Sequence, residues 1–337
     1  MTTVDLFAIG NALIDQEFKV SNEFLTQQAL QKGTMQLTDG ETQAALYQQL
    51  QDTQNYKGQA SGGSAANTTV AFSALGGTAF YGCRVGNDDL GSIYLNGLNE
   101  AGIKTAAQSI SEGVTGTCMV LISPDSERTM HTYLGITAEL TAEQIDFEPL
   151  KAAKWLYIEG YLSTSDTARV AVKQARELAK AHGVKIALSL SDPAMVQYAR
   201  QGLEELLDDG VDLLFCNEQE ALMFSNTETL DAAIEVLKSK NQHIVITQGA
   251  NGAVIIDPEQ QFHVAGREVH AVDTNGAGDA FAGAFLYAIN AGLTLKAAAQ
   301  LAILISSEVV AQFGPRLAVE NYAKLFEQFK NSQQEYA

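Results

Sequence analysis

The sequence has few basic residues, few cysteines and few prolines. Its 337 residues carry 21 lysines and arginines against 40 acidic side chains, which gives a formal net charge of −19. A nucleic acid or an anionic membrane needs a basic footprint on its protein partner, so this balance argues against both. Any phosphate group that the protein handles must therefore be bound by local features of the fold.

The three cysteines, Cys83, Cys118 and Cys216, are far apart in the sequence and form no C-x-x-C pair. Their spacing argues against a disulfide framework and against a zinc ribbon, so we expect buried thiols in a reducing compartment. The histidines have no metal-ligand spacing either, since His263 and His270 belong to separate runs.

Long apolar runs are also missing. None reaches the ~18 residues needed to cross a bilayer, and the nearest, 295–311, is interrupted by Lys296 and Glu308. The first ten residues have no basic segment and predict a strand rather than a secretory signal. We therefore expect a folded, cytoplasmic protein without a membrane partner.

Short apolar runs alternate with segments of helical periodicity along most of the chain. The runs that we expect to form strands are 4–9, 118–123, 155–158, 184–190, 211–215, 243–247 and 253–256. Helical segments such as 64–75, 166–181 and 229–239 lie between them. This alternation predicts an α/β fold with a mostly parallel central sheet covered by helices on both sides.

Two stretches break the alternation, at about 17–38 and 113–135. The second alternates apolar and polar residues around a Pro124-Asp125 turn, which predicts a half-exposed antiparallel hairpin. We expect both stretches to form a small β appendage inserted into a single domain that spans 1–337.

One segment places a carboxylate beside small residues at a predicted helix start. In 272–281, Gly276-Ala277-Gly278 precedes Asp279 and an apolar helix. The free amides at such a helix start can form an anion hole. An isolated first-turn aspartate usually only complements the helix dipole. Next to an anion hole, however, it can accept a hydroxyl proton during phosphoryl transfer to an alcohol.

Two common phosphate-binding motifs are absent from the sequence. It contains no G-x-x-x-x-G-K-[ST], which argues against a P-loop kinase, and no strand is followed by G-x-G-x-x-G, which argues against a dinucleotide site.

Three segments resemble the motifs of one enzyme family. Asp273–Asp279 resembles the C-terminal signature of the ribokinase-like (PfkB) carbohydrate and nucleoside kinases, Gly62–Asn67 resembles their N-terminal signature, and Asn217–Glu220 resembles their N-x-x-E motif. Their order and spacing fit, and the resemblance covers nearly the whole chain. Segments 10–15 and 306–311 are most similar to the adenosine-kinase branch.

The resemblance implies a three-layer ribokinase-like fold in which the appendage is a small β-sheet lid over the substrate. It implies ATP as phosphoryl donor, Mg²⁺ as cofactor and a sugar or nucleoside as acceptor. Family members often use K⁺ near the residues that match Asp273 and Gly314. A homodimer formed through the lid is also compatible with the resemblance.

The resemblance assigns a role to each matching residue. The proton acceptor is Asp279, and the anion hole comprises Gly276, Ala277 and Gly278. The substrate-binding residues are Asn11, Asp15, Gly62, Gly63 and Asn67. The nucleotide contacts are Thr247, Gly249 and Gly252, and Mg²⁺ is held through water by Asn217 and Glu220.

Each of these assignments has a simpler structural alternative. Gly62-Gly63 and Asn67 also suit plain helix capping, and Asp15 also suits a solvated turn. Asn217 and Glu220 have the spacing of a capping box. Thr247–Gly252 joins two predicted strands, so it needs no function beyond that of a hairpin turn.

Other residues are weaker candidates. Met35, Leu37, Cys118 and Val120 could line the substrate side of the lid, although ordinary packing explains them equally well. We expect Arg128, near the hairpin tip, to be solvated, with Lys32 as the other basic residue of the lid. Glu159 and Tyr161 follow a predicted strand and are weaker substrate candidates.

The function that we expect is phosphorylation by ATP of a primary hydroxyl on a ribose-like substrate, with a purine nucleoside such as adenosine favoured. The alternatives are a free-sugar kinase of the ribokinase or fructokinase type, a sugar-phosphate kinase, and a sensor that binds a nucleotide or sugar without turnover. Asp279 in the anion hole argues against the sensor.

Overall fold

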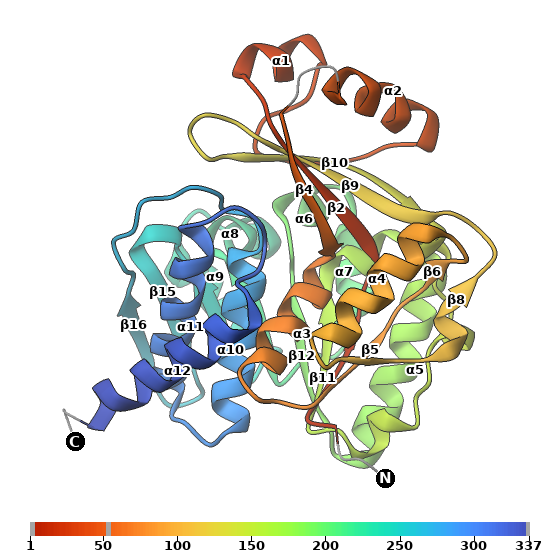
Figure 1. The fold of residues 1–337 in the computed structure, drawn as a ribbon. Helices are drawn as coiled ribbons and strands as arrows, with labels where there is room; N and C mark the ends of the chain where they lie inside the picture. The colour runs from red at the N-terminus through yellow and green to blue at the C-terminus, as the bar shows by residue number, and fades with distance from the viewer. Residues whose placement is uncertain (1–3, 52–54, 335–337) are drawn as a thin grey trace.

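A nine-stranded sheet runs through the centre of the molecule (Figure 1). The computed structural model describes residues 4–51 and 55–334. The strand order is β16-β15-β14-β13-β12-β11-β1-β5-β7, parallel throughout except for the antiparallel pairs β14/β15 and β15/β16. The strands are β1 (Leu6–Ile9), β5 (Ala79–Gly82), β7 (Lys104–Thr105), β11 (Trp155–Glu159), β12 (Lys185–Ser189), β13 (Leu213–Asn217), β14 (His243–Thr247), β15 (Gly252–Ile256) and β16 (Gln261–Ala265).

Helices cover both faces of this sheet, so its central strands are buried on both sides. One face packs on α5 (Asp166–His182), α6 (Pro193–Tyr198), α7 (Arg200–Leu207), α8 (Glu218–Ser225) and α9 (Leu230–Lys238). The other packs on α3 (Ser64–Ala74), α4 (Asp89–Glu100), α10 (Ala277–Asn290), α11 (Leu295–Val310) and α12 (Val319–Gln334). Leu156 and Tyr157, adjacent in β11, contribute to opposite cores because side chains alternate along a strand. The three-layer α/β prediction is confirmed.

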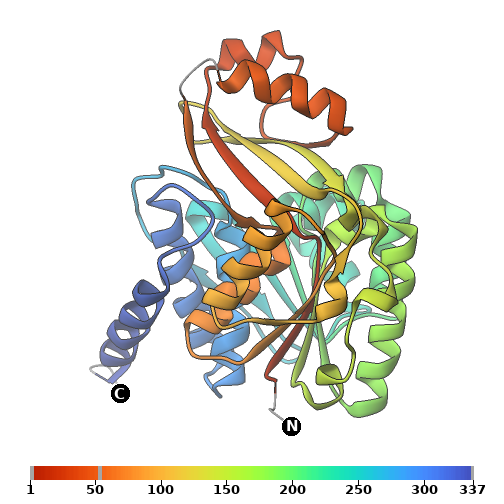
Figure 2. The same cartoon turned by 45° about the vertical axis from the view of Figure 1, so that its right-hand side comes forward.

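A second sheet lies across one end of the molecule (Figure 2). Its order is β3-β10-β9-β2-β4, with β2 (Leu13–Lys19), β3 (Met35–Leu37), β4 (Tyr56–Gly62), β9 (Thr115–Ile122) and β10 (Arg128–Gly135). We call this sheet the lid. Its first part spans 13–62 rather than the expected 17–38, because β2 begins four residues after β1 ends and β4 leads directly into α3.

Helices α1 (Asn22–Gln27) and α2 (Gly40–Gln51) cover the outer face of the lid (Figure 1). Leu25, Leu46 and Leu50 pack there on Met119 and Leu121 of β9. Cys118 and Val120 alternate with these two residues along β9, so they point inward, to the opposite face of the lid. The hairpin is therefore buried on both faces, and the expectation of a half-exposed one is wrong.

The remaining elements are short. They are β6 (Val85–Gly86), β8 (Ile110–Ser111) and the 3-10 helices at Ala107–Ser109, Ile136–Glu139, Ala142–Gln144, Pro149–Ala152, Gly160–Thr164 and Gly249–Asn251. Across the described part of the chain, no helix combines the length and apolar character required to span a membrane. Cys83, Cys118 and Cys216 are all buried free thiols, as expected.

Candidate active site

Two cavities meet where the lid approaches the carboxyl ends of the parallel strands. The smaller, of about 70 Å³, lies under the lid, and the larger, of about 460 Å³, lies over the turns that follow β12, β13 and β14. Asp279 and Arg128 line both cavities. Open α/β sheets bind ligands at this end.

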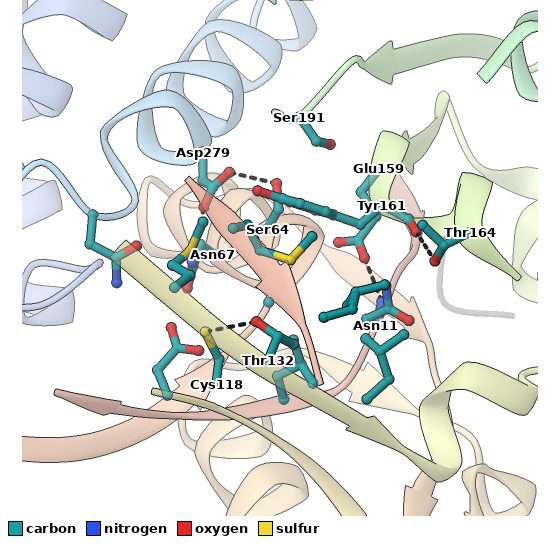
Figure 3. Close-up of a pocket in the computed structure, with 18 of the residues that line it drawn as sticks. Asn11, Ser64, Asn67, Cys118, Thr132, Glu159, Tyr161, Thr164, Ser191 and Asp279 are labelled. Atoms are coloured by element: carbon teal, nitrogen blue, oxygen red, sulfur yellow. Dashed lines mark hydrogen bonds between the residues drawn. The ribbon is translucent and has the colours of Figure 1, made fainter. Parts of the chain in front are cut away.

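Asp279 lies in the first turn of α10, at the junction of the two cavities (Figure 3). Its Oδ1 accepts a hydrogen bond of 2.6 Å from Ser64 Oγ, and its Oδ2 accepts one of 2.9 Å from Asn67 Nδ2. Burial raises the pKa of Asp279 above its usual value, and the bonds from Ser64 and Asn67 oppose this rise. Helix α3 therefore fixes the carboxylate that α10 presents.

The residues before Asp279 form the start of α10. Gly276 is the N-cap residue with φ +73°, and a Cβ there would lie 2.4 Å from the carbonyl oxygen of Pro315. Only glycine fits this position. A Cβ at Gly278 would meet nothing within 4 Å, so its backbone faces open space. Gly276 and Gly278 line the larger cavity, where first-turn amides can receive an anion.

Asp15 lies within the lid strand β2 rather than in a turn after β1, and it points back into the smaller cavity. It is 6% exposed, so it is not the solvated turn aspartate of the alternative interpretation. Burial raises the pKa of Asp15 to about 7; the charge of Arg316 opposes the rise, and Asp279 adds to it. A buried carboxylate of this kind suits a ligand that donates hydrogen bonds.

Glu159 joins the two segments that the sequence predicts to bind substrate. It is fully buried at the end of β11. Each of its two carboxylate oxygens accepts a 2.7 Å hydrogen bond from a backbone amide, one from that of Asn11 and one from that of Ala65. Burial raises the pKa of Glu159 to about 7, although both bonds lower it. No local sequence pattern indicates this role, because its partners are 148 and 94 residues away in the chain.

The lid supplies an apolar wall to the smaller cavity. Met35, Leu37 and Cys118 line it as expected, together with Met130 and Leu134. Val120 does not line this cavity; it is fully buried in the core. On the opposite side, Tyr161, Thr164 and Ser191 point inward (Figure 3).

Arg128 is not the solvated arginine that the sequence predicted. Its Nη1 donates a 3.0 Å hydrogen bond to Oδ1 of Asn275, and its side chain lines both cavities. The reason is that β10 begins at Arg128 and directs it inward, under the hairpin tip. Lys32 is bonded instead to Asp125, at 2.5 Å, and lines neither cavity.

Asn217 and Glu220 line the larger cavity and also form the capping box of the alternative interpretation. Glu220 accepts from the amide of Asn217 at 3.0 Å and from its Nδ2 at 2.7 Å. Burial raises the pKa of Glu220 to about 8. In the described part of the chain, no three His, Cys, Asp or Glu side chains could hold a metal ion. The pair fits Mg²⁺ only if water and phosphate supply the other ligands.

Some of the remaining predicted residues line the larger cavity, and others shape the backbone near it. Thr247 and Gly249 line the larger cavity. Gly252 does not line it: φ is +99° there, and a Cβ would lie 2.0 Å from the carbonyl oxygen of Val264, so this glycine serves the hairpin. Asp273 and Gly314 do come together, because the amide of Gly314 donates to Asp273 Oδ2 at 3.0 Å.

The chain is similar to known proteins over nearly its whole length. The family model described as pfkB family carbohydrate kinase matches residues 6–321. Adenosine kinase from Saccharomyces cerevisiae is 28% identical, with 96% of this chain and all of that one aligned. The crystal structure of adenosine kinase from Sinorhizobium meliloti superposes with a TM-score of 0.91 at 33% identity, over 97% of this chain and 99% of that one. A probable sugar kinase from Rhizobium etli gives the same TM-score and coverage at 32% identity.

The packing of Gly62 against Asp15 generates a prediction. A Cβ at Gly62 would lie 2.1 Å from the Asp15 carboxyl carbon and from its Oδ1, so Gly62→Ala must displace that side chain. We expect a loss of ~1–3 kcal/mol in the free energy of unfolding, measured by urea denaturation. Gly278→Ala, which adds the same methyl group to open space, is the control and should lose less than half as much. Equal losses would show that the contact with Asp15 is not the cause.

Proposed function

Because the chain belongs to the pfkB family of carbohydrate kinases, we propose that it transfers the γ-phosphoryl group of ATP to a primary hydroxyl of a purine nucleoside such as adenosine. It is a phosphotransferase with an alcohol group as acceptor. The observation that carries the proposal is the position of Asp279, at the start of a helix and in the wall that two cavities share.

The acceptor hydroxyl lies in the smaller cavity, close to Asp279. There the carboxylate accepts the hydroxyl proton while Ser64 and Asn67 hold its two oxygens in position. Its raised pKa makes it a better proton acceptor than an exposed aspartate. Asp15, Asn11 and the backbone at Gly63 bind the ribose hydroxyls from the lid side and the sheet side.

The phosphates of ATP lie in the larger cavity. The amides at the start of α10, next to Gly276 and Gly278, receive the charge that develops on the transferred group. Arg128 reaches the same place from the lid and supplies a positive charge. Asn217 and Glu220 would hold Mg²⁺ through water, and the ion would neutralise part of the phosphate charge. Involvement of K⁺ near Asp273 and Gly314 stays a prediction.

The apolar wall of the lid favours a nucleoside over a free sugar. Met35, Leu37 and Thr164 line both the smaller cavity and a neighbouring groove of about 850 Å³. A ribose bound to Asp15 can therefore extend its base along this wall toward the groove. The modest volume of the smaller cavity, about 70 Å³, favours the second candidate, a kinase acting on free ribose or a similar small sugar.

Replacing the proton acceptor tests the mechanism. Asp279→Asn keeps the shape of the side chain but removes the basic oxygen, so we expect kcat to fall by ~10²–10⁴ while ATP binding persists. Release of ADP measures kcat, and calorimetry measures binding. Asp231→Asn, another first-turn aspartate, on α9 outside both cavities, is the control and should retain full activity. Near-full turnover by Asp279→Asn would refute its assignment.

The acceptor is tested with a panel of adenosine, inosine, ribose, fructose and fructose 6-phosphate. We expect the highest kcat/KM for a purine nucleoside, lower values for the free sugars and little activity with fructose 6-phosphate, because a dianionic acceptor needs a cation dedicated to its phosphate. Arg128 is bonded to Asn275 instead. Faster turnover of fructose 6-phosphate, lost in Arg128→Ala, would overturn the choice of acceptor and leave the kinase assignment intact.

The raised pKa of Asp15, about 7, predicts opposite effects of pH on activity and stability. Hydroxyl binding needs the ionised carboxylate, so kcat/KM for the nucleoside should fall as pH drops below about 7. Because the folded-state pKa is above that of the unfolded chain, folding favours the protonated form, and the free energy of unfolding without ligand should fall as pH rises through about 7. In Asp15→Asn the stability change should shrink; an unaltered change would exclude Asp15 as its source.

A further inference from the structure

Arg316, in the loop between α11 and α12, is a cation that the motifs did not indicate. Its Nε donates a 2.7 Å hydrogen bond to Oδ1 of Asn67, 249 residues earlier in the chain. Its Nη2 is buried and has no hydrogen-bond partner among the residues that the structure describes. Arg316 is not in the wall of either cavity, so any effect on a bound substrate must pass through another residue.

The hydrogen bond to Asn67 fixes the orientation of that amide. An arginine only donates hydrogen bonds, so it requires the oxygen end of the asparagine, and the NH₂ end then points away from it. That end donates to Asp279 Oδ2 at 2.9 Å. The three side chains therefore form one chain of hydrogen bonds, Arg316 to Asn67 to Asp279, in which each partner permits only one orientation of the amide.

The positive charge of Arg316 favours the ionised form of Asp279, which the hydrogen bond from Asn67 also favours. The charged groups around Asp279 are Asp15 from the lid strand β2, Arg128 from β10, Glu159 from the end of β11, and Arg316. Burial raises the pKa of both Asp15 and Asp279, and the charge of Arg316 lowers the pKa of each. A guanidinium stays charged when buried, so this effect persists at every pH at which the enzyme folds.

The loop that carries Arg316 is also attached to the anion hole. The amide of Gly314 donates to Asp273, and Pro315 packs on Gly276, where it leaves no room for a Cβ. Arg316 is thus held by the residues that form the start of α10. Because the loop is fixed at this end, a shift of the anion hole would also move Arg316 and, through its hydrogen bond, Asn67 on α3.

We propose that Arg316 is a positioning residue that holds Asn67, and through it Asp279, in the orientation that proton transfer requires. This inference rests on the proposed function, because it gives Asp279 the role of proton acceptor. Arg316 acts on the chemical step and contributes little to ATP binding, since it lies outside the cavity that would hold the phosphates.

The test compares Arg316→Met and Arg316→Lys with the wild-type protein in steady-state ADP-release assays. We expect Arg316→Met to lower kcat by ~10- to 100-fold, as a small misplacement of a catalytic group does, with the KM for ATP changed less than about threefold. Arg316→Lys retains the positive charge and can still donate a hydrogen bond, so it should recover part of kcat. The acid limb of the pH profile should move to higher pH in Arg316→Met and stay near the wild-type position in Arg316→Lys.

A double mutant separates positioning from general damage. If Arg316 acts through Asn67, Arg316→Met should change kcat by less than about threefold in an Asn67→Ala background, whereas independent effects would multiply. Arg200→Met is the control: Arg200 also donates to other parts of the chain, to the carbonyl oxygens of Met223 and Phe224, but lies in neither cavity. Its kcat should be unchanged.

The outcomes distinguish this inference from the proposed function. If the wild-type protein phosphorylates no hydroxyl acceptor, or if Asp279→Asn is fully active, the proposed function fails. If the wild type is active and Asp279→Asn is not, yet Arg316→Met retains kcat and the wild-type pH profile, only the role of Arg316 fails. Multiplicative effects in the double mutant would likewise overturn it.

Discussion

The burial of carboxylates at the junction of lid and sheet is the constraint on which the site depends. Asp15, Glu159, Glu220 and Asp279 all lose solvation there, and burial raises the pKa of each. Burying a carboxylate destabilises the folded protein unless the group accepts hydrogen bonds or faces a cation. The fold supplies backbone amides to Glu159, a hydroxyl and an amide to Asp279, and arginines on two sides.

Small residues are needed wherever these carboxylates approach the backbone. A side chain at Gly62 would collide with Asp15, and one at Gly10 would lie 2.5 Å from Glu159. Gly62, from the N-terminal signature, and Gly10, which follows β1, therefore do more than leave a helix start unshielded. They allow a lid strand, a sheet strand and helix α3 to converge on one small volume. The same closeness explains why the lid cannot move without altering the surroundings of Asp15, which it carries.

Each of the two arginines of the site links separate parts of the chain. Arg128 reaches from the lid to Asn275, next to the anion hole, and Arg316 reaches from the loop after α11 to Asn67 on α3. With a net charge of −19, the protein has few cations to place, and two of them lie beside its buried acids. Of these two, only Arg128 lines the larger cavity, so it is the cation that an acidic protein offers where the proposed function places the phosphates of ATP.

The sequence by itself determined the α/β class, the family and the position of Asp279. Strand–helix alternation follows from local periodicity, and an anion hole needs contiguous backbone, so both leave a local pattern. The sequence pattern predicted β1 and the hairpin β14–β15 but did not indicate the short strands β5 and β16. It also predicted a shorter first lid segment than the structure has. Only the tertiary structure decided that Arg128 points inward, that Glu159 clamps two segments and that Arg316 meets Asn67. Those contacts join residues 94 to 249 positions apart, and packing, rather than any local pattern, brings them together.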